Sequence, residues 1–225
     1  MKKIILLLSV IVLGIILSSC KSEFLPEVYI RDLLDISDGT EELIYTPATI
    51  KIEVSSKSSF EEDKEKITAI LQKYLGKISN VSFEESGFDN FYVAQIEVPI
   101  RSFSSNGLSE NLFAFEVMKD ENQNIVFAIL FNNDLFEQMK KETYNTFYST
   151  IEISDITIII RLINDLREDI KITTQSVYLN DKPCPFKTSY ILKRRRKANL
   201  LFSNVLRDYL QCSDRIKLVD ITINE

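Results

Sequence analysis

Apolar residues recur at every second position in two widely separated segments, 49–54 and 154–163. The apolar positions are Ile50, Ile52 and Val54 in the first segment, and Ile156, Ile158, Ile160 and Leu162 in the second. A period of two is the spacing of side chains on one face of a β-strand. Both segments therefore predict half-buried strands, which restricts the chain to folds built around a sheet with one apolar face.

Short apolar runs bounded by turn residues predict the remaining strands. They lie at 81–85, 90–100, 111–118, 124–131, 170–179, 187–193 and 215–223. The segment 196–211 fits two interpretations, a strand followed by a short helix or one continuous helix. Phe113, Phe115, Phe127 and Phe131 recur at period two in the predicted hairpin. They could line a ligand pocket, but core packing is the better interpretation, because a sheet needs one apolar face.

Two helices are predicted in the first half of the chain. Ser59 and Glu62 have the spacing of a capping box, and Gly76 lies just past the end of the apolar periodicity that follows. A second helix is expected from Asp134 to about residue 147, and its inward positions are Phe136, Met139 and Tyr144.

Together these elements predict an α+β fold. Residues 43–147 are expected to form an antiparallel-rich sheet with two packing helices, and 150–225 a smaller β-sandwich-like unit. Residues 20–42 are expected to be a tether and lead-in to the first unit.

The first twenty residues have the organisation of an export signal. Lys2 and Lys3 precede an apolar run from 4 to 17, which is shorter than the roughly 20 residues that a spanning helix needs. Ser18, Ser19 and Cys20 follow, and they resemble the lipobox of bacterial lipoproteins. This resemblance implies a signal peptide over 1–19, cleavage between Ser19 and Cys20, and lipid on the Cys20 thiol. An uncleaved anchor helix is the alternative. Lys21 in the next position favours the outer membrane.

The charge and composition exclude several classes of partner and activity. The formal net charge of −6 argues against a nucleic-acid partner and against electrostatic anchoring to an anionic bilayer. The absence of histidine removes Ser-His-Asp and Cys-His catalysis and every imidazole-based zinc site. Five glycines provide no Gly-rich nucleotide cradle. We therefore expect no enzyme, no metal and no cofactor.

Two cysteines remain besides Cys20. Cys184 and Cys212 are an even pair in an exported protein, and we expect them to form a disulfide that stabilises by about 3 kcal/mol. Two free thiols are the alternative.

A basic run at 193–197 interrupts the otherwise mixed charge pattern. Arg194, Arg195 and Arg196 lie at its centre. They could bind an anionic surface component through its phosphate groups, or an acidic partner protein. Alternatively, they form a solvated turn that protects an edge strand from aggregation.

The order of these segments resembles a family of uncharacterised lipoproteins found in bacteria and their prophages. The segments that carry the resemblance are TPATIKIEV (46–54), FDNFYVAQIEVPI (88–100), KKE (140–142), IIIRLIND (158–165) and VYLNDKP (177–183). The family is a domain of unknown function without an assigned active site, so the resemblance implies no functional residue. The basic run at 193–197 is a departure from it.

The sequence leads to two functional hypotheses. The first is a non-catalytic interaction module that is lipid-anchored in the cell envelope, faces the periplasm and contacts another envelope protein or an anionic surface component. The alternative is a periplasmic carrier for a small apolar ligand. A closed pocket larger than about 300 Å³ would favour the carrier, and a filled core with an exposed apolar patch would favour the interaction module.

Overall fold

The computed structural model describes residues 21–103 and 110–223, so the predicted cleavage and lipidation site at Ser19 and Cys20 lies outside the described residues. The elements of the first part are β1 (Ser22–Tyr29), α2 (Ile30–Ser37), β2 (Leu43–Val54), α3 (Lys57–Leu75), β3 (Ile78–Ser86), β4 (Asp89–Ser102), β5 (Phe113–Lys119), β6 (Ile125–Phe131) and α4 (Asn133–Phe147). The second part contains the 3-10 turn η1 (Ile153–Asp155), β7 (Ile156–Ile163), β8 (Ile170–Thr174), β9 (Val177–Leu179), β10 (Lys182–Cys184), β11 (Thr188–Leu192), β12 (Lys197–Phe202), α5 (Asn204–Leu210) and β13 (Arg215–Ile223).

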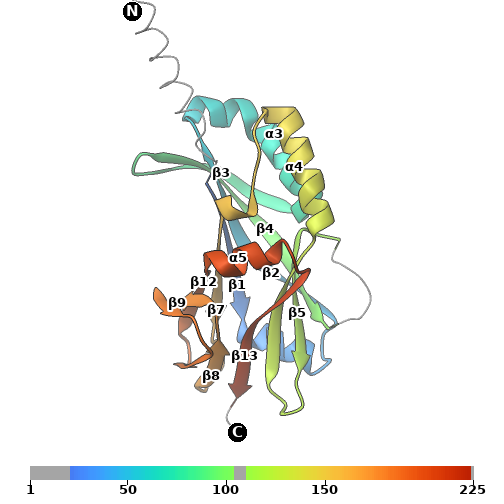
Figure 1. The fold of residues 1–225 in the computed structure, drawn as a ribbon, viewed down its shortest axis with the longest axis vertical. Coiled ribbons are helices and arrows are strands. Elements are labelled where there is room, and N and C mark those ends of the chain that lie inside the picture. Colours follow the sequence, from blue (N-terminus) through green and yellow to red (C-terminus); the bar gives the residue numbers. More distant parts are fainter. Residues whose placement is uncertain (1–20, 104–109, 224–225) are drawn as a thin grey trace, which may run out of the picture.

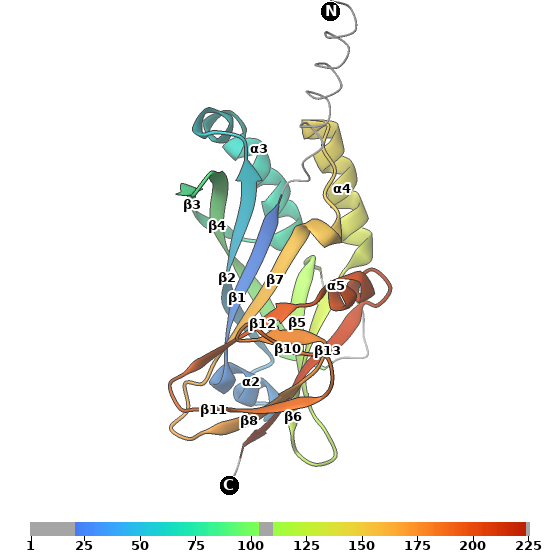
Figure 2. The ribbon, with the colours of Figure 1, turned by 60° about the vertical axis from the view of Figure 1, so that its left-hand side comes forward.

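The strands of the described residues form one mostly antiparallel, nearly closed sheet (Figures 1 and 2). Their order is β10-β9-β12-β7-β1-β2-β4-β5-β6-β13-β8-β11, and β3 pairs with β4 outside this path. The prediction of an α+β fold with an antiparallel-rich sheet and two packing helices is confirmed. Because β7 pairs with β1 and β13 pairs with β6, the strands of 150–225 continue the sheet of the preceding strands at both edges.

The lead-in is part of this sheet. Ser22–Tyr29 forms β1, which pairs antiparallel with β2 and parallel with β7. Phe24 and Val28 point into the core at 2% and 0% exposure. The prediction of a tether was therefore wrong from Ser22 onward, because the alternation of buried and half-buried residues in this short segment is that of a strand.

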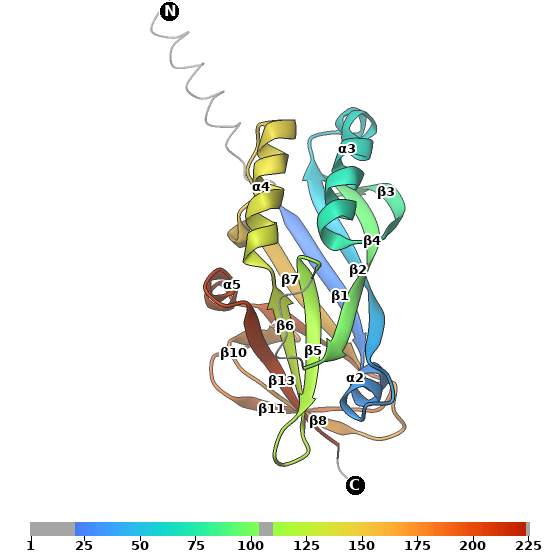
Figure 3. The same cartoon turned by 90° about the vertical axis from the view of Figure 1, so that its right-hand side faces the viewer.

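Helix α2 fills one end of the curved sheet (Figures 2 and 3). It packs against β1, β2, β4, β5 and β6. Ile30, Leu33 and Ile36 lie on one face of the helix at spacings of three, and each is at most 1% exposed. This end of the molecule is therefore filled with side chains.

Helices α3 and α4 cover the other end (Figure 3). Ser56 caps α3 by accepting a hydrogen bond from the Ser59 amide, so the helix begins one turn before the predicted capping box. Gly76 ends it with a φ of 85°, as expected for a glycine at this position. Asn132 caps α4 in the same way through the Leu135 amide.

The two interpretations of 196–211 are separated by the structure. Residues 197–202 form β12, which pairs with β7 and β9, and Ser203 caps the short helix α5. The expected strand at 170–179 is two strands, β8 and β9, because the backbone turns between them at Ser176, whose φ is 60°.

Candidate functional site

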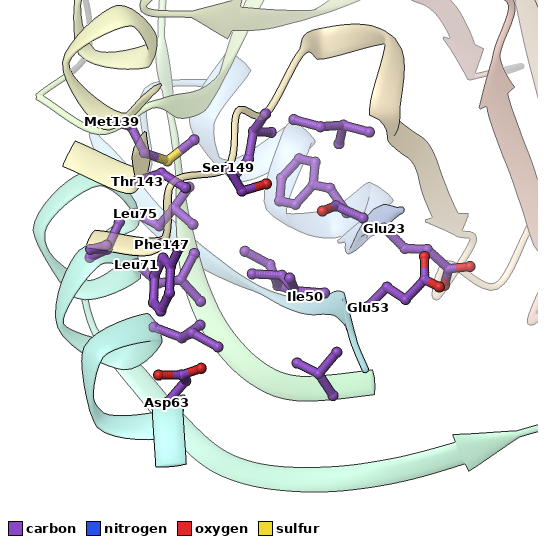
Figure 4. Close-up of a pocket in the computed structure, with 18 of the residues that line it drawn as sticks. Glu23, Ile50, Glu53, Asp63, Leu71, Leu75, Met139, Thr143, Phe147 and Ser149 are labelled. Carbon is purple, nitrogen blue, oxygen red and sulfur yellow. The ribbon is translucent and has the colours of Figure 1, made fainter. Parts of the chain in front are cut away.

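An apolar groove lies between the helices α3 and α4 and the adjoining face of the sheet (Figure 4). Its volume is about 390 Å³. Most of the lining residues are aliphatic or aromatic. They include Phe24, Ile50, Ile52, Ile67, Ile70, Leu71, Leu75, Leu112, Phe113, Met139, Phe147, Ile151 and Ile156.

Side chains from one face of α3 and one face of α4 form the wall of the groove on the helix side. Ile67, Leu71 and Leu75 recur every four residues along α3, and Met139 and Thr143 have the same spacing on α4. Phe136 and Met139 are buried as predicted, but Tyr144 is 52% exposed. The inward position on this turn of α4 is Thr143, because it is four residues after Met139.

Strands β1 and β2 form the floor of the groove, which is its side opposite the helices. Phe24 and Ile50 face the helices. Glu23 near the start of β1 and Glu53 near the end of β2 border the groove at its edge. Figure 4 shows the carboxylates of Glu23 and Glu53 on the side away from α3 and α4. The floor is therefore apolar although the strands carry acidic residues.

One buried polar group among the lining residues lacks a hydrogen-bond partner. Ser22 is 8% exposed, and its Oγ has no partner among the described residues. Leaving a buried hydroxyl unpaired costs about 1–3 kcal/mol. Ser22 thus leaves one hydrogen-bonding group unsatisfied beside the groove.

A polar link joins the two helices above the groove. Glu142 Oε2 of α4 accepts hydrogen bonds from Lys73 Nζ at 2.5 Å and from Tyr74 Oη at 2.7 Å, both on α3. The bonds from Lys73 and Tyr74 hold the pKa of the Glu142 carboxyl below its ordinary value. Burial and the bond to Glu142 raise the pKa of the Tyr74 hydroxyl. This link fixes the spacing of the helices that border the groove.

The predicted aromatic face is mostly core. Phe115 and Phe127 are fully buried, with ring centroids 5.0 Å apart. Phe113 stacks on Phe24 at 4.3 Å and contacts Phe131 at 5.3 Å. Of the four phenylalanines, Phe113 also lines the groove. The sequence alone did not separate these roles, because all four residues face the same side of the sheet.

The predicted disulfide is absent from the structure. Cys184 and Cys212 are both free thiols. Cys184 lies in the core at the end of β10, whereas Cys212 is exposed after α5, where it lines a second hollow of about 610 Å³. The prediction was wrong because an even cysteine count gives no information on where the fold places each thiol.

The basic run forms the turn between β11 and β12. Arg194, Arg195 and Arg196 are all exposed, and Arg195 has a φ of 55°. The Arg194 amide donates to Asp169 Oδ1, and the Asn164 amide donates to the Arg196 carbonyl oxygen. The loop after β7, which contains Asn164 and Asp165, also contacts α2, because the Arg31 amide donates to Asp165 Oδ1. The arginines thus lie at the α2 end and outside the groove.

The comparison with protein families matches residues 22–221 to a domain of unknown function, DUF7424. The chain belongs to the DUF7424 family. The expectation of an uncharacterised domain family is thereby confirmed. No curated protein and no solved structure matches the chain significantly.

The matched range coincides with the sheet of this DUF7424 protein, from the first residue of β1 into β13. The groove is therefore built entirely from residues of the family domain. Across the described parts of the chain, no helix is long and apolar enough to cross a bilayer. The same residues bring no three Asp, Glu or Cys side chains together in a way that could hold a metal ion.

Proposed function

We propose that this DUF7424 protein is a lipid-anchored bacterial envelope lipoprotein that carries a small apolar ligand in the groove beneath α3 and α4. The observation that carries the proposal is the 390 Å³ apolar groove. This volume lies in the range of ligand sites, which are mostly apolar with a few polar groups that orient the ligand. The groove exceeds the volume expected for a carrier, but it is partly open rather than closed, so a ligand can enter without unfolding of the domain.

The sequence supports the anchoring part of the proposal. Lys2 and Lys3, the apolar run and Ser19 before Cys20 are typical of a lipoprotein signal, and Lys21 favours retention at the periplasmic face of the outer membrane. The resemblance to lipoproteins of bacteria and their prophages supports a bacterial or prophage origin of this protein. Two or three acyl chains on Cys20 would hold the protein at the bilayer, since each buried methylene contributes about 0.8 kcal/mol.

Growth in labelled palmitate tests the anchor. The wild-type product is expected to carry the label and to lack residues 1–19, and Cys20→Ser is expected to remain unlabelled. A mature wild-type product without label would contradict the anchor and leave the groove hypothesis to be judged separately.

A photoactivatable fatty acid carrying a diazirine tests the groove. Irradiation with the full-length lipoprotein in vesicles is expected to label the α3 and α4 segments that line the groove. Thr143→Trp and Ile67→Trp fill the groove from its two helical sides and should abolish this labelling. Lys141→Trp, on the exposed face of α4, is the matched control and should retain it. Equal labelling of all three folded variants would rule out the groove as the ligand site.

A second candidate function rests on the basic turn. Arg194, Arg195 and Arg196 project into solvent, and among residues 21–103 and 110–223 no carboxylate forms an ion pair with them. This supports contact with an anionic envelope component or an acidic partner. Replacement of the three arginines by glutamine should weaken binding to anionic vesicles, and unchanged binding would reject this function.

A further inference from the structure

The β3–β4 hairpin projects from the body of the molecule (Figures 1 and 3). Ser86 pairs with Asp89, so the loop consists of Gly87 and Phe88 alone. Gly87 has a φ of 65°, which a glycine adopts without strain. The Phe88 side chain at this tip is 104% exposed, so it makes no packing contribution to the domain.

Hydrogen bonds and an ion pair place this tip beside the start of the described chain. Lys21 Nζ lies 3.6 Å from Asp89 Oδ2. The backbone of Lys21 is fixed against β2, because the Glu53 amide donates to the Lys21 carbonyl oxygen at 2.9 Å. Asp89, the residue after Phe88, therefore lies beside Lys21, which directly follows Cys20 in the sequence.

One border of the groove lies at the same end, because Ser22, the residue after Lys21, lines the groove. Asn90 Nδ2 donates to the carbonyl oxygen of Ser55, a residue that lines the groove. The C-terminus of α4 also lies at this end (Figure 3), and it carries two more exposed aromatic residues. Tyr144 and Tyr148 are 52% and 84% exposed, and their ring centroids are 6.3 Å apart.

The charges around the tip do not suit an anionic partner. Glu84 and Asp89 flank the tip and pair with Lys51 and Lys21, while Glu85 adds a further acidic group. Phenylalanine and tyrosine side chains, in contrast, insert readily at the boundary between head groups and acyl chains, where Tyr is enriched in membrane proteins. The aromatic residues, rather than charge, would therefore provide the contact with a lipid surface.

We propose that Phe88, Tyr144 and Tyr148 rest in the bilayer that holds the lipid on Cys20, so that the border of the groove at Ser22 and Ser55 faces the membrane. This inference rests on the proposed lipid anchor and adds an orientation to it. An anchor alone would hold the domain at one point, the start of β1, and would leave its tilt against the bilayer free. A second contact at the hairpin tip fixes one end against the bilayer, and an acyl chain can then pass between bilayer and groove without crossing water.

The absence of tryptophan from the chain makes a direct test possible. Phe88→Trp introduces a single fluorophore at the tip. Phe186→Trp is the matched control, because Phe186 is 80% exposed on the β10–β11 connection, away from the groove. Both variants are prepared as full-length lipoproteins in zwitterionic vesicles whose acyl chains carry bromine at defined depths.

The emission of Phe88→Trp is expected to shift to shorter wavelength and to lose intensity to bromine placed about 5–10 Å below the head groups. Phe186→Trp should show neither change. A vesicle-bound Phe88→Trp protein that is quenched no more than the control would overturn the inference. A wavelength shift without bromine quenching would also overturn it, because it would place Phe88 against protein, such as a second copy of the chain.

Flotation of the vesicles separates this outcome from failure of the anchor. If the protein floats with the vesicles and Phe88→Trp is not quenched, the orientation is wrong and the anchor stands. If wild-type lipoprotein does not float, the anchor itself fails, and the orientation falls with it.

Discussion

The two ends of the sheet are covered by helices in different ways. At one end the eight-residue helix α2 lies inside the curve of the sheet, and its apolar face is at most 1% exposed. At the other end α3 and α4 lie across the sheet and leave a groove of about 390 Å³. Helix α2, within the curve, contacts five strands, whereas α3 and α4 contact each other and α3 also contacts the sheet. The same sheet therefore supports a stabilising core at one end and a candidate binding site at the other.

The difference has an energetic consequence. A close-packed interior loses both transfer free energy and packing when a side chain is shortened, whereas a side chain that borders open space has fewer neighbours to lose. The α2 end should therefore provide more stability per side chain than the groove end.

The largest effect is expected at Leu33, which is 0% exposed in α2. Leu33→Ala should reduce the free energy of unfolding by about 4 kcal/mol, in the upper part of the range for buried leucines. Urea denaturation of the full-length protein measures it. Leu34→Ala, a half-buried neighbour in the same helix, is the control and should cost less. Equal losses at both positions would show that α2 is not packed as described.

A smaller loss is expected at Leu71, which is 6% exposed and lines the groove. Leu71→Ala should cost about 2 kcal/mol, because one side of this side chain already faces open space. The same denaturation experiment measures it. A loss as large as that of Leu33→Ala would mean that the groove is closed in solution and would remove the contrast between the two ends.

The smallest effect is expected at the link between α3 and α4. Glu142→Gln should cost about 0.2–1 kcal/mol at neutral pH, because Lys73 and Glu142 are partly exposed and solvent screens their ion pair. The folded-state pKa of Glu142 is lowered, so its contribution is present above its ordinary pKa near 4.5 and is lost as the pH falls through the lowered value.

Unfolding free energies of wild type and Glu142→Gln, measured across this pH range, should converge on acidification. Glu62→Gln removes one exposed charge from α3 without altering the link and should show no such convergence. A difference that persists unchanged at low pH would indicate that the carboxylate does not stabilise the helix pair.

The sequence predicted the elements that have a clear period. The strands at β2 and β7 and both helices bordering the groove follow from apolar spacing, which depends only on the local backbone. The segment of β1 was missed because Pro26 and the charged residues Glu23 and Glu27 mask its alternation. The inward position of Thr143 was missed because Tyr144 is the more apolar neighbour.

The sequence by itself determined the α+β class, the family resemblance and the strand and helix periods. Only the tertiary structure decided that β1 and β7 are neighbours, that Cys184 and Cys212 stay apart, and that a groove opens beneath α3 and α4. The physical reason is that periodicity records which side of an element is apolar, whereas pairing, thiol positions and empty space depend on contacts between residues far apart in the chain.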